Sequence, residues 1–108
     1  MGLLDFLKGP DINKGVTEYR NTPGAVLIDV RTPGEYRSGH IAGSVNVPLQ
    51  SIADIQNVVP DKSTPVFAYC QSGARSAQAV KQLGRMGYTG ARNIGGIGSW
   101  TGKVEKSS

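Results

Sequence analysis

Apolar residues along this chain fall into short runs separated by glycine, proline and polar residues. Behind Asp11, a residue type that caps helices, the apolar side chains from Ile12 to Tyr19 repeat at i, i+4 and i+7, which predicts a helix over residues 12–20. Residues 25–28 are continuously apolar, as expected of a parallel strand that is buried on both faces. The first predicted elements are therefore a helix and a buried strand.

The same alternation continues to the C-terminus. Strands that alternate with helices through short connections indicate an α/β fold, in which a central, mainly parallel β-sheet carries helices on both faces. The further predicted elements are a short helix from Thr32 and Pro33 through Arg37, an extended piece at residues 44–46, a helix over about residues 50–58, a strand at residues 66–69, a helix over residues 72–86 that stops at Gly87, and a final strand at residues 91–94, with Trp100 anchoring the C-terminal turn.

The length limits the chain to a single domain. At 108 residues it can bury about two thirds of its unfolded surface, which is enough for one core. We place the domain at residues 11–104, after an apolar N-terminal segment at residues 1–10 and before a tail at residues 105–108. The N-terminal segment is too short to span a membrane and lacks the basic start of a signal peptide, so we expect it to cover part of the domain or to bind a partner. We expect a monomer.

The charge balance argues against a nucleic-acid partner. Twelve basic and eight acidic residues leave a net charge of +4, and the basic residues are scattered along the chain. A nucleic-acid surface shows clustered basic residues with aromatic residues between them. The excess charge either attracts small anions or belongs to an ordinary solvated surface.

The scarcity of cysteine and histidine excludes several kinds of site. Cys70 is the only cysteine, so the chain has no intramolecular disulfide, no C-x-x-C redox pair and no cysteine-built zinc site. His40 is the only histidine, which rules out a histidine-based metal site. We therefore expect no metal and no organic cofactor. An unpaired thiol fits a reducing compartment, and we expect a cytoplasmic protein.

Cys70 stands where a predicted strand ends and a predicted helix begins. Helix N-termini expose unpaired backbone N–H groups and carry partial positive charge, so they bind anions and lower the pKa of a thiol. A thiol with a pKa of about 8.5 is only ~3% thiolate at pH 7, whereas a pKa of about 6.5 makes roughly three quarters of it nucleophilic. We therefore interpret Cys70 as a nucleophile rather than as a core residue.

The segment around Cys70 resembles the active-site loop of the rhodanese family of sulfurtransferases. It reads C-x-x-G-x-R, with four residues between Cys70 and Arg75. Two further segments match family signatures in family order. Residues 29–48 contain D-V-R, E-Y and G-H-I-x-G-S-x-N-x-P, with Ser44 where alanine is commoner, and residues 93–100 contain G-G-x-x-x-W. The three matches span roughly residues 26–102.

This resemblance implies an enzyme of the thiosulfate sulfurtransferase type. Cys70 would take a sulfane sulfur from thiosulfate or a similar small anionic donor, form a persulfide, and pass the sulfur to cyanide, a thiol or a protein acceptor. The backbone amides of the loop would bind the anion. The substrate-binding residues would then be Gln71, Ser72, Gly73, Ala74, Arg75 and Ser76.

Several roles inside the loop stay open at this point. Ser72 either donates a hydroxyl hydrogen bond or caps the helix. Arg75 either binds the sulfonate of thiosulfate through its planar guanidinium or folds back onto a carboxylate and braces the loop. Gly73 allows the chain to turn where a β-carbon would clash.

Two functions from other classes also remain. The first is a phosphatase on the same fold, but phosphatase loops carry five residues between cysteine and arginine, one more than this chain has. The second is a rhodanese-like binding module or a sulfur-relay protein that acts on a protein partner. The intact Cys70 argues against an inert module and is compatible with a relay.

Four residues outside the loop are predicted to support the site. Asp29 and Arg31 bracket the end of the first buried strand, where Asp29 would orient a neighbouring loop and Arg31 would pair with Glu35. His40 could serve as a base for Cys70. We favour a structural role for it, because the Gly-His-Ile segment is a structural turn in the family and a thiolate held by backbone amides needs no strong base.

Overall fold

A parallel four-stranded sheet forms the centre of the protein. In the computed structural model, which describes residues 9–107, its strand order is β3–β1–β4–β5. The sheet confirms the predicted parallel α/β fold and places the strand that ends in Cys70 in its interior. The strands are β1 (Val26–Asp29), β3 (Val45–Asn46), β4 (Val66–Cys70) and β5 (Ala91–Gly96).

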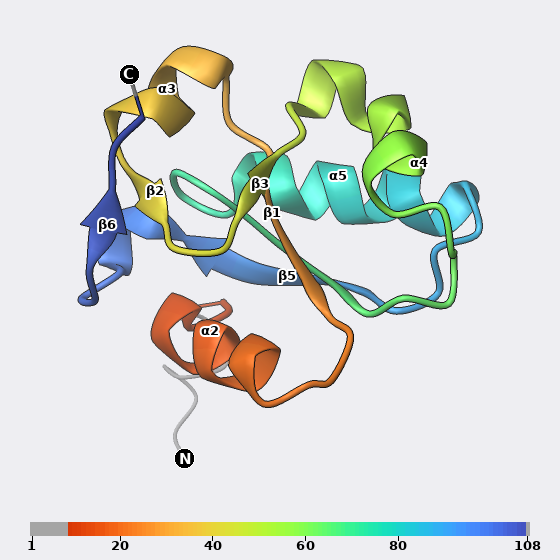
Figure 1. Cartoon of the computed structure of the whole chain (residues 1–108), viewed down its shortest axis with the longest axis horizontal. Helices are drawn as coiled ribbons and strands as arrows, with labels where there is room; N and C mark the ends of the chain where they lie inside the picture. Colours follow the sequence, from red (N-terminus) through yellow and green to blue (C-terminus); the bar gives the residue numbers. More distant parts are fainter. Residues whose placement is uncertain (1–8, 108) are drawn as a thin grey trace.

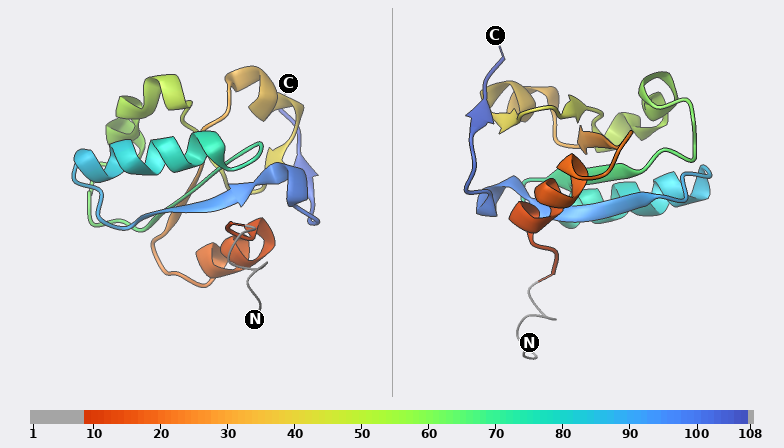
Figure 2. Two further views of the ribbon diagram at one scale, coloured as in Figure 1. Left: turned by 180° about the vertical axis from the view of Figure 1, so that it is seen from behind. Right: turned by 60° about the horizontal axis from the view of Figure 1, so that its bottom comes forward.

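Helices cover both faces of this sheet (Figures 1 and 2). One face carries α2 (Ile12–Arg20), which begins behind Asp11 as predicted. The other face carries α5 (Ala74–Arg85) together with the 3-10 helix η1 (Leu49–Asp54) and α4 (Ile55–Val58). The strand β4 is thus covered by helices on both faces up to Cys70.

A small antiparallel sheet lies toward the edge where the parallel strands end (Figure 1). It pairs β2 (His40–Ile41) with β6 (Val104–Glu105). Beside it lies α3 (Pro33–Ser38), and the 3-10 helix η2 (Ile97–Ser99) follows β5.

Alternation along β4 divides the core into two clusters. Val66, Ala68 and Cys70 pack with α4 and α5, whereas Phe67 and Tyr69 pack with α2. Successive side chains of a strand point to opposite faces, so a strand covered on both sides is buried throughout, and every residue of β4 is buried. The Cys70 side chain therefore points toward the α5 side of the sheet.

Three sequence predictions need correction. The single helix over residues 50–58 is instead the 3-10 helix η1 followed by α4, with non-helical backbone angles at Ser51 inside η1, although Ile52 and Ile55 are buried as expected. The helix expected from residue 72 begins at Ala74, because the residues before it form a turn. The strand at residues 91–94 is longer and is not the last one, because β6 follows it.

Two further points concern the ends of the chain and membranes. The predicted role of the apolar N-terminal segment rests on residues 1–8, which lie outside the described residues. Within residues 9–107, no helix combines the length and the apolar character needed to cross a bilayer.

Candidate active site

The turn between β4 and α5 brings a backbone amide onto the Cys70 thiol. Gly73 is the N-cap of α5 and has a φ of 102°, in the left-handed region that favours a residue without a β-carbon. In this conformation its N–H donates to Cys70 Sγ at 2.9 Å. The thiol therefore lies under the amides of a helix N-terminus, which is the arrangement that the sequence predicted.

The surroundings of Cys70 lower the pKa of its thiol. Burial acts in the opposite direction, because the residue is 0% exposed and a thiolate is costly away from water. Hydrogen bonds from the Ser76 hydroxyl and from the backbone N–H groups of Ser76, Gly73 and Ser72 outweigh this cost, so the pKa lies below its usual value. The sequence predicted the loop amides as donors but did not single out the Ser76 hydroxyl.

The other loop residues present backbone rather than side-chain chemistry. Gln71 and Ser72 are exposed, and Ala74 is exposed at the start of α5. Of the two roles left open for Ser72, capping the helix is excluded, because the N-cap is Gly73 and the cap position has no side-chain hydrogen bond. Ser72 instead contributes its backbone N–H to the thiol.

The backbone of the loop packs directly against glycines of β5 and η2. A β-carbon on Gly96 would overlap the carbonyl oxygen of Gln71 and approach the Cα of Ser72 to 2.6 Å. The N–H of Gly98 donates to the same Gln71 carbonyl at 3.1 Å. This close backbone approach explains the glycine at position 96. Its neighbour Gly95 has a φ of 108°, and a β-carbon there would lie 2.9 Å from the carbonyl oxygen of Pro10.

Arg75 braces the loop against α3. Its guanidinium donates to both carboxylate oxygens of Glu35, from Nη1 at 2.8 Å and from Nη2 at 2.9 Å. Glu35 also accepts from the backbone N–H of Thr32 at 3.0 Å, so it closes the capping box of α3. The Arg75 guanidinium, by hydrogen bonding, lowers the pKa of Glu35 to about 2. This is the bracing arrangement of the two considered for Arg75.

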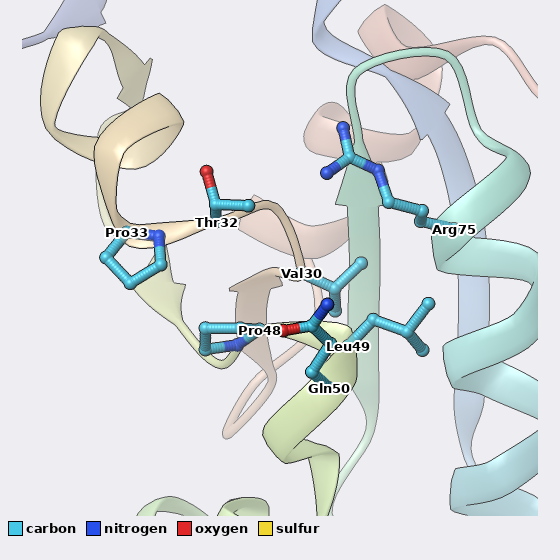
Figure 3. A pocket seen from close by; sticks show the side chains of 7 residues that line it. All are labelled: Val30, Thr32, Pro33, Pro48, Leu49, Gln50 and Arg75. Carbon is cyan, nitrogen blue, oxygen red and sulfur yellow. The ribbon is translucent and has the colours of Figure 1, made fainter.

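Arg75 also lies on the wall of a small, mainly apolar pocket beside the loop (Figure 3). Val30 and Leu49 lie between the Arg75 side and the Thr32 and Pro33 side in this view. The full lining is Val30, Thr32, Pro33, Pro48, Leu49, Gln50 and Arg75. The pocket adjoins the loop at Arg75, and the Cys70 side chain is not part of its lining.

The predicted pairing of Arg31 with Glu35 is wrong. Arg31 is buried and donates to Asp29 through Nε at 3.1 Å and through Nη2 at 2.7 Å, while Nη2 also donates to the Gly39 carbonyl. Asp29 further accepts from the backbone N–H of Arg31 at 2.9 Å. A separation of two residues lets this pair close locally, and Glu35 is already held by Arg75. Asp29 and Arg31 thus fix the chain where β1 leads toward α3.

His40 is engaged by α3 rather than by the thiol. Its ring stacks on Tyr36 with centroids 3.8 Å apart, and Nδ1 lies 2.8 Å from the Tyr36 carbonyl oxygen. A carbonyl can only accept, so Nδ1 carries the proton. These contacts agree with a structural role for His40.

Asn93 is a residue that the sequence did not single out. Its side chain reaches from β5 to the loop and to α5, where it contacts Gly73 and Ser76. Only the three-dimensional register of β5 beside β4 shows this position. Among residues 9–107, no group of three or more His, Cys, Asp or Glu side chains is placed to hold a metal ion.

The fold and site together define a class: a parallel α/β domain with a cysteine in an amide-lined loop at the end of an interior strand. A scan against family models matches residues 13–103 to the rhodanese-like domain. The chain therefore belongs to the rhodanese family, as the sequence motifs indicated.

Individual relatives agree. The chain is 44% identical over 71 residues to thiosulfate sulfurtransferase PspE of Escherichia coli, which covers 65% of this chain and 68% of that protein. It is 38% identical over 81 residues to a sulfurtransferase of Allochromatium vinosum, covering 74% and 75%. A solved structure described as rhodanese with anions, from E. coli, superposes with a TM-score of 0.72 at 38% identity and covers 77% of this chain and 99% of its own. These relatives support a sulfurtransferase activity.

Proposed function

We propose that this protein is a thiosulfate sulfurtransferase that works through a Cys70 persulfide. The observation that carries the proposal is the Gly73 N–H at 2.9 Å from the thiol sulfur, within a loop that lowers the pKa of that thiol. Two relatives that match most of this domain are named as sulfurtransferases, and one of them as a thiosulfate sulfurtransferase.

In the first half of the proposed reaction, the Cys70 thiolate attacks the outer sulfur of thiosulfate. The sulfur–sulfur bond of thiosulfate breaks, sulfite leaves with the bonding electron pair, and a persulfide forms on Cys70. The backbone N–H groups around Gly73 stabilise the negative charge on the outer sulfur of that persulfide. Arg75 contributes positive charge at the edge of the loop while it holds Glu35.

In the second half, an acceptor removes the sulfur. A thiolate acceptor attacks the outer sulfur, the persulfide bond breaks, and Cys70 leaves as a thiolate. The chain contains no second cysteine that could resolve the persulfide internally, so the acceptor comes from outside: cyanide, a small thiol or a protein thiol. No proton donor is required in either half, which fits the engagement of His40 by Tyr36.

A substitution of Cys70 by serine tests this function. We expect Cys70→Ser to reduce thiosulfate:cyanide sulfur transfer to background, because the chain has no other thiol, while the circular dichroism spectrum stays that of the wild type. Turnover and spectrum are measured on the same preparation. Transfer above about a tenth of the wild-type rate in a folded Cys70→Ser protein would contradict the role of Cys70.

A further inference from the structure

The side-chain amide of Asn93 connects three parts of the site. Asn93 Oδ1 accepts from the Ser76 hydroxyl at 2.7 Å and from the backbone N–H of Gly95 at 3.0 Å. Asn93 Nδ2 donates to the carbonyl of Gly73 at 3.2 Å. One amide therefore links β5, the loop and the first turn of α5.

These contacts determine which way the amide points. If the oxygen and nitrogen were exchanged, the amide NH2 would face the Gly95 N–H, and the amide oxygen would face the Gly73 carbonyl. The first contact would then place a donor against a donor, and the second an acceptor against an acceptor. Both are destabilising in a part-buried site. The orientation of Asn93 is therefore set by the backbone on two sides, and the side chain serves as a fixed bridge.

Ser76 has more acceptors than it can use at once. Its Oγ lies 2.7 Å from Asn93 Oδ1, 3.1 Å from the Gly73 carbonyl and 3.4 Å from Cys70 Sγ, and a hydroxyl carries a single proton. The Gly73 carbonyl already accepts from Asn93 Nδ2 and from the backbone N–H of Ala77 at 3.1 Å, so it competes weakly for that proton. The proton is thus shared between Asn93 Oδ1 and the sulfur.

We propose that Asn93 is a positioning residue for sulfur transfer, which acts on Cys70 through Ser76 and through the Gly73 carbonyl. While the sulfur is a neutral thiol, the Ser76 hydroxyl donates to Asn93. When the sulfur is negatively charged, the hydroxyl turns to it, and Asn93 Oδ1 keeps the Gly95 N–H as its donor. The amide also holds Gly73 so that its N–H stays directed at the sulfur. This role deepens the proposed function and rests on it.

Asn93→Ala tests the proposal. Without the amide, the Gly73 carbonyl keeps only the Ala77 N–H as a donor and accepts the Ser76 proton, and the loop loses the side-chain link from β5. Both effects weaken donation to the sulfur, so we expect the midpoint of the pH profile for Cys70 alkylation by iodoacetamide to rise by about half a unit or more. We expect kcat for sulfur transfer to fall about tenfold, with a smaller change in KM for thiosulfate.

Matched variants separate this role from general damage. Asn57→Ala removes an exposed asparagine of α4 and should leave both readouts unchanged. Asn93→Gln keeps an uncharged amide but lengthens the side chain by one CH2 group, so it cannot keep all three contacts and tests the geometry of the bridge if Asn93→Ala does not fold. In a Ser76→Ala background, Asn93→Ala should have a smaller effect than in the wild type, because part of its action passes through Ser76.

Other results would overturn the proposal. A folded Asn93→Ala or Asn93→Gln protein with a lower thermal midpoint but an unchanged alkylation profile would mean that Asn93 is only a structural link. A downward shift of the profile would mean that Asn93 withholds the Ser76 proton from the sulfur. Alkylation does not require sulfur transfer, so these outcomes are distinct from a failure of the proposed activity.

Discussion

At the scale of single residues, the reactivity of Cys70 depends on hydrogen-bond donors rather than on a base. The sulfur receives the Gly73 N–H and lies within reach of the Ser76 hydroxyl. The one histidine is turned to Tyr36. Fixed donors stabilise the thiolate whatever the pH, whereas a histidine partner supplies its positive charge only while it is protonated.

Arg75→Lys tests whether Arg75 braces the loop. Lysine keeps the positive charge but cannot bond both oxygens of Glu35 at once. We expect a loss of about 0.5–1 kcal/mol in stability, since the pair is partly exposed, together with an upward shift of the Cys70 alkylation profile. Thermal unfolding, the alkylation pH profile and KM for thiosulfate are measured together. A raised KM with unchanged stability and alkylation would show instead that Arg75 acts by binding the donor anion.

At the scale of elements, the loop packs so closely against β5 that a side chain added to this strand at Gly96 would displace the loop. Gly96 lies in the register of Cys70, as its partner across the β4–β5 pair. A β-carbon there meets backbone atoms of Gln71 and Ser72, which cannot rotate away as a flexible side chain could. The position of the nucleophile therefore depends on the absence of a side chain on the neighbouring strand.

Two glycine substitutions test this dependence. Gly96→Ala should displace the loop, lower stability by about 1–3 kcal/mol and reduce sulfur transfer at least about tenfold. Gly84→Ala, on the exposed side of α5 where a β-carbon meets nothing within 4 Å, should raise stability by about 0.5–1 kcal/mol and leave transfer unchanged. For each variant, stability is measured by chemical denaturation and sulfur transfer by turnover. Equal behaviour of the two variants would contradict a close approach specific to Gly96.

The ion pair between Glu35 of α3 and Arg75 of α5 predicts that the stability of the fold depends on pH. The pKa of Glu35 is lowered from 4.5 to about 2, so its pairing with Arg75 stabilises the folded state fully above pH 4.5 and is lost as the pH falls toward 2. Glu35→Gln keeps the capping box and removes the charge.

We therefore expect the wild type to exceed Glu35→Gln in stability by about 0.5–1 kcal/mol at neutral pH, with the difference disappearing toward pH 2. Urea unfolding across this pH range measures it. Glu18→Gln, which disrupts the more exposed pair with Arg92, is the control and should show a smaller difference. A difference between wild type and Glu35→Gln that is independent of pH would mean that the charge of Glu35 is not what stabilises α3.

At the scale of the whole molecule, helices and strands whose burial leaves a periodic pattern in the sequence could be predicted. Pairings between short segments far apart in the chain could not. The helix from Ile12, the buried strand that ends at Cys70 and the parallel sheet follow from local periodicity. The pairing of β2 with β6 joins two-residue segments far apart in the chain, and such short segments have no periodic signal.

The same distinction holds within the site. The position of Cys70 at a strand–helix junction could be predicted, because both flanking elements have clear patterns. Whether Arg75 contacts an anion or Glu35 depends on a distance across the fold. The predicted partner of Arg31 is wrong because Glu35 is already held by Arg75, which the sequence does not show. Asn93 could not be recognised from sequence at all, because its partners Gly73 and Ser76 lie in another element.

The central claim, that the Cys70 sulfur accepts and carries a sulfur atom, is tested most directly by intact mass. The purified protein is incubated with thiosulfate, freed of excess donor and weighed by mass spectrometry, with Cys70→Ser treated in parallel. We expect the wild type to gain the mass of one sulfur atom, to lose it on addition of cyanide or a thiol, and the serine variant to gain nothing. A wild-type mass that stays unchanged under conditions where sulfur transfer is measured, or an equal gain in Cys70→Ser, would contradict the persulfide mechanism.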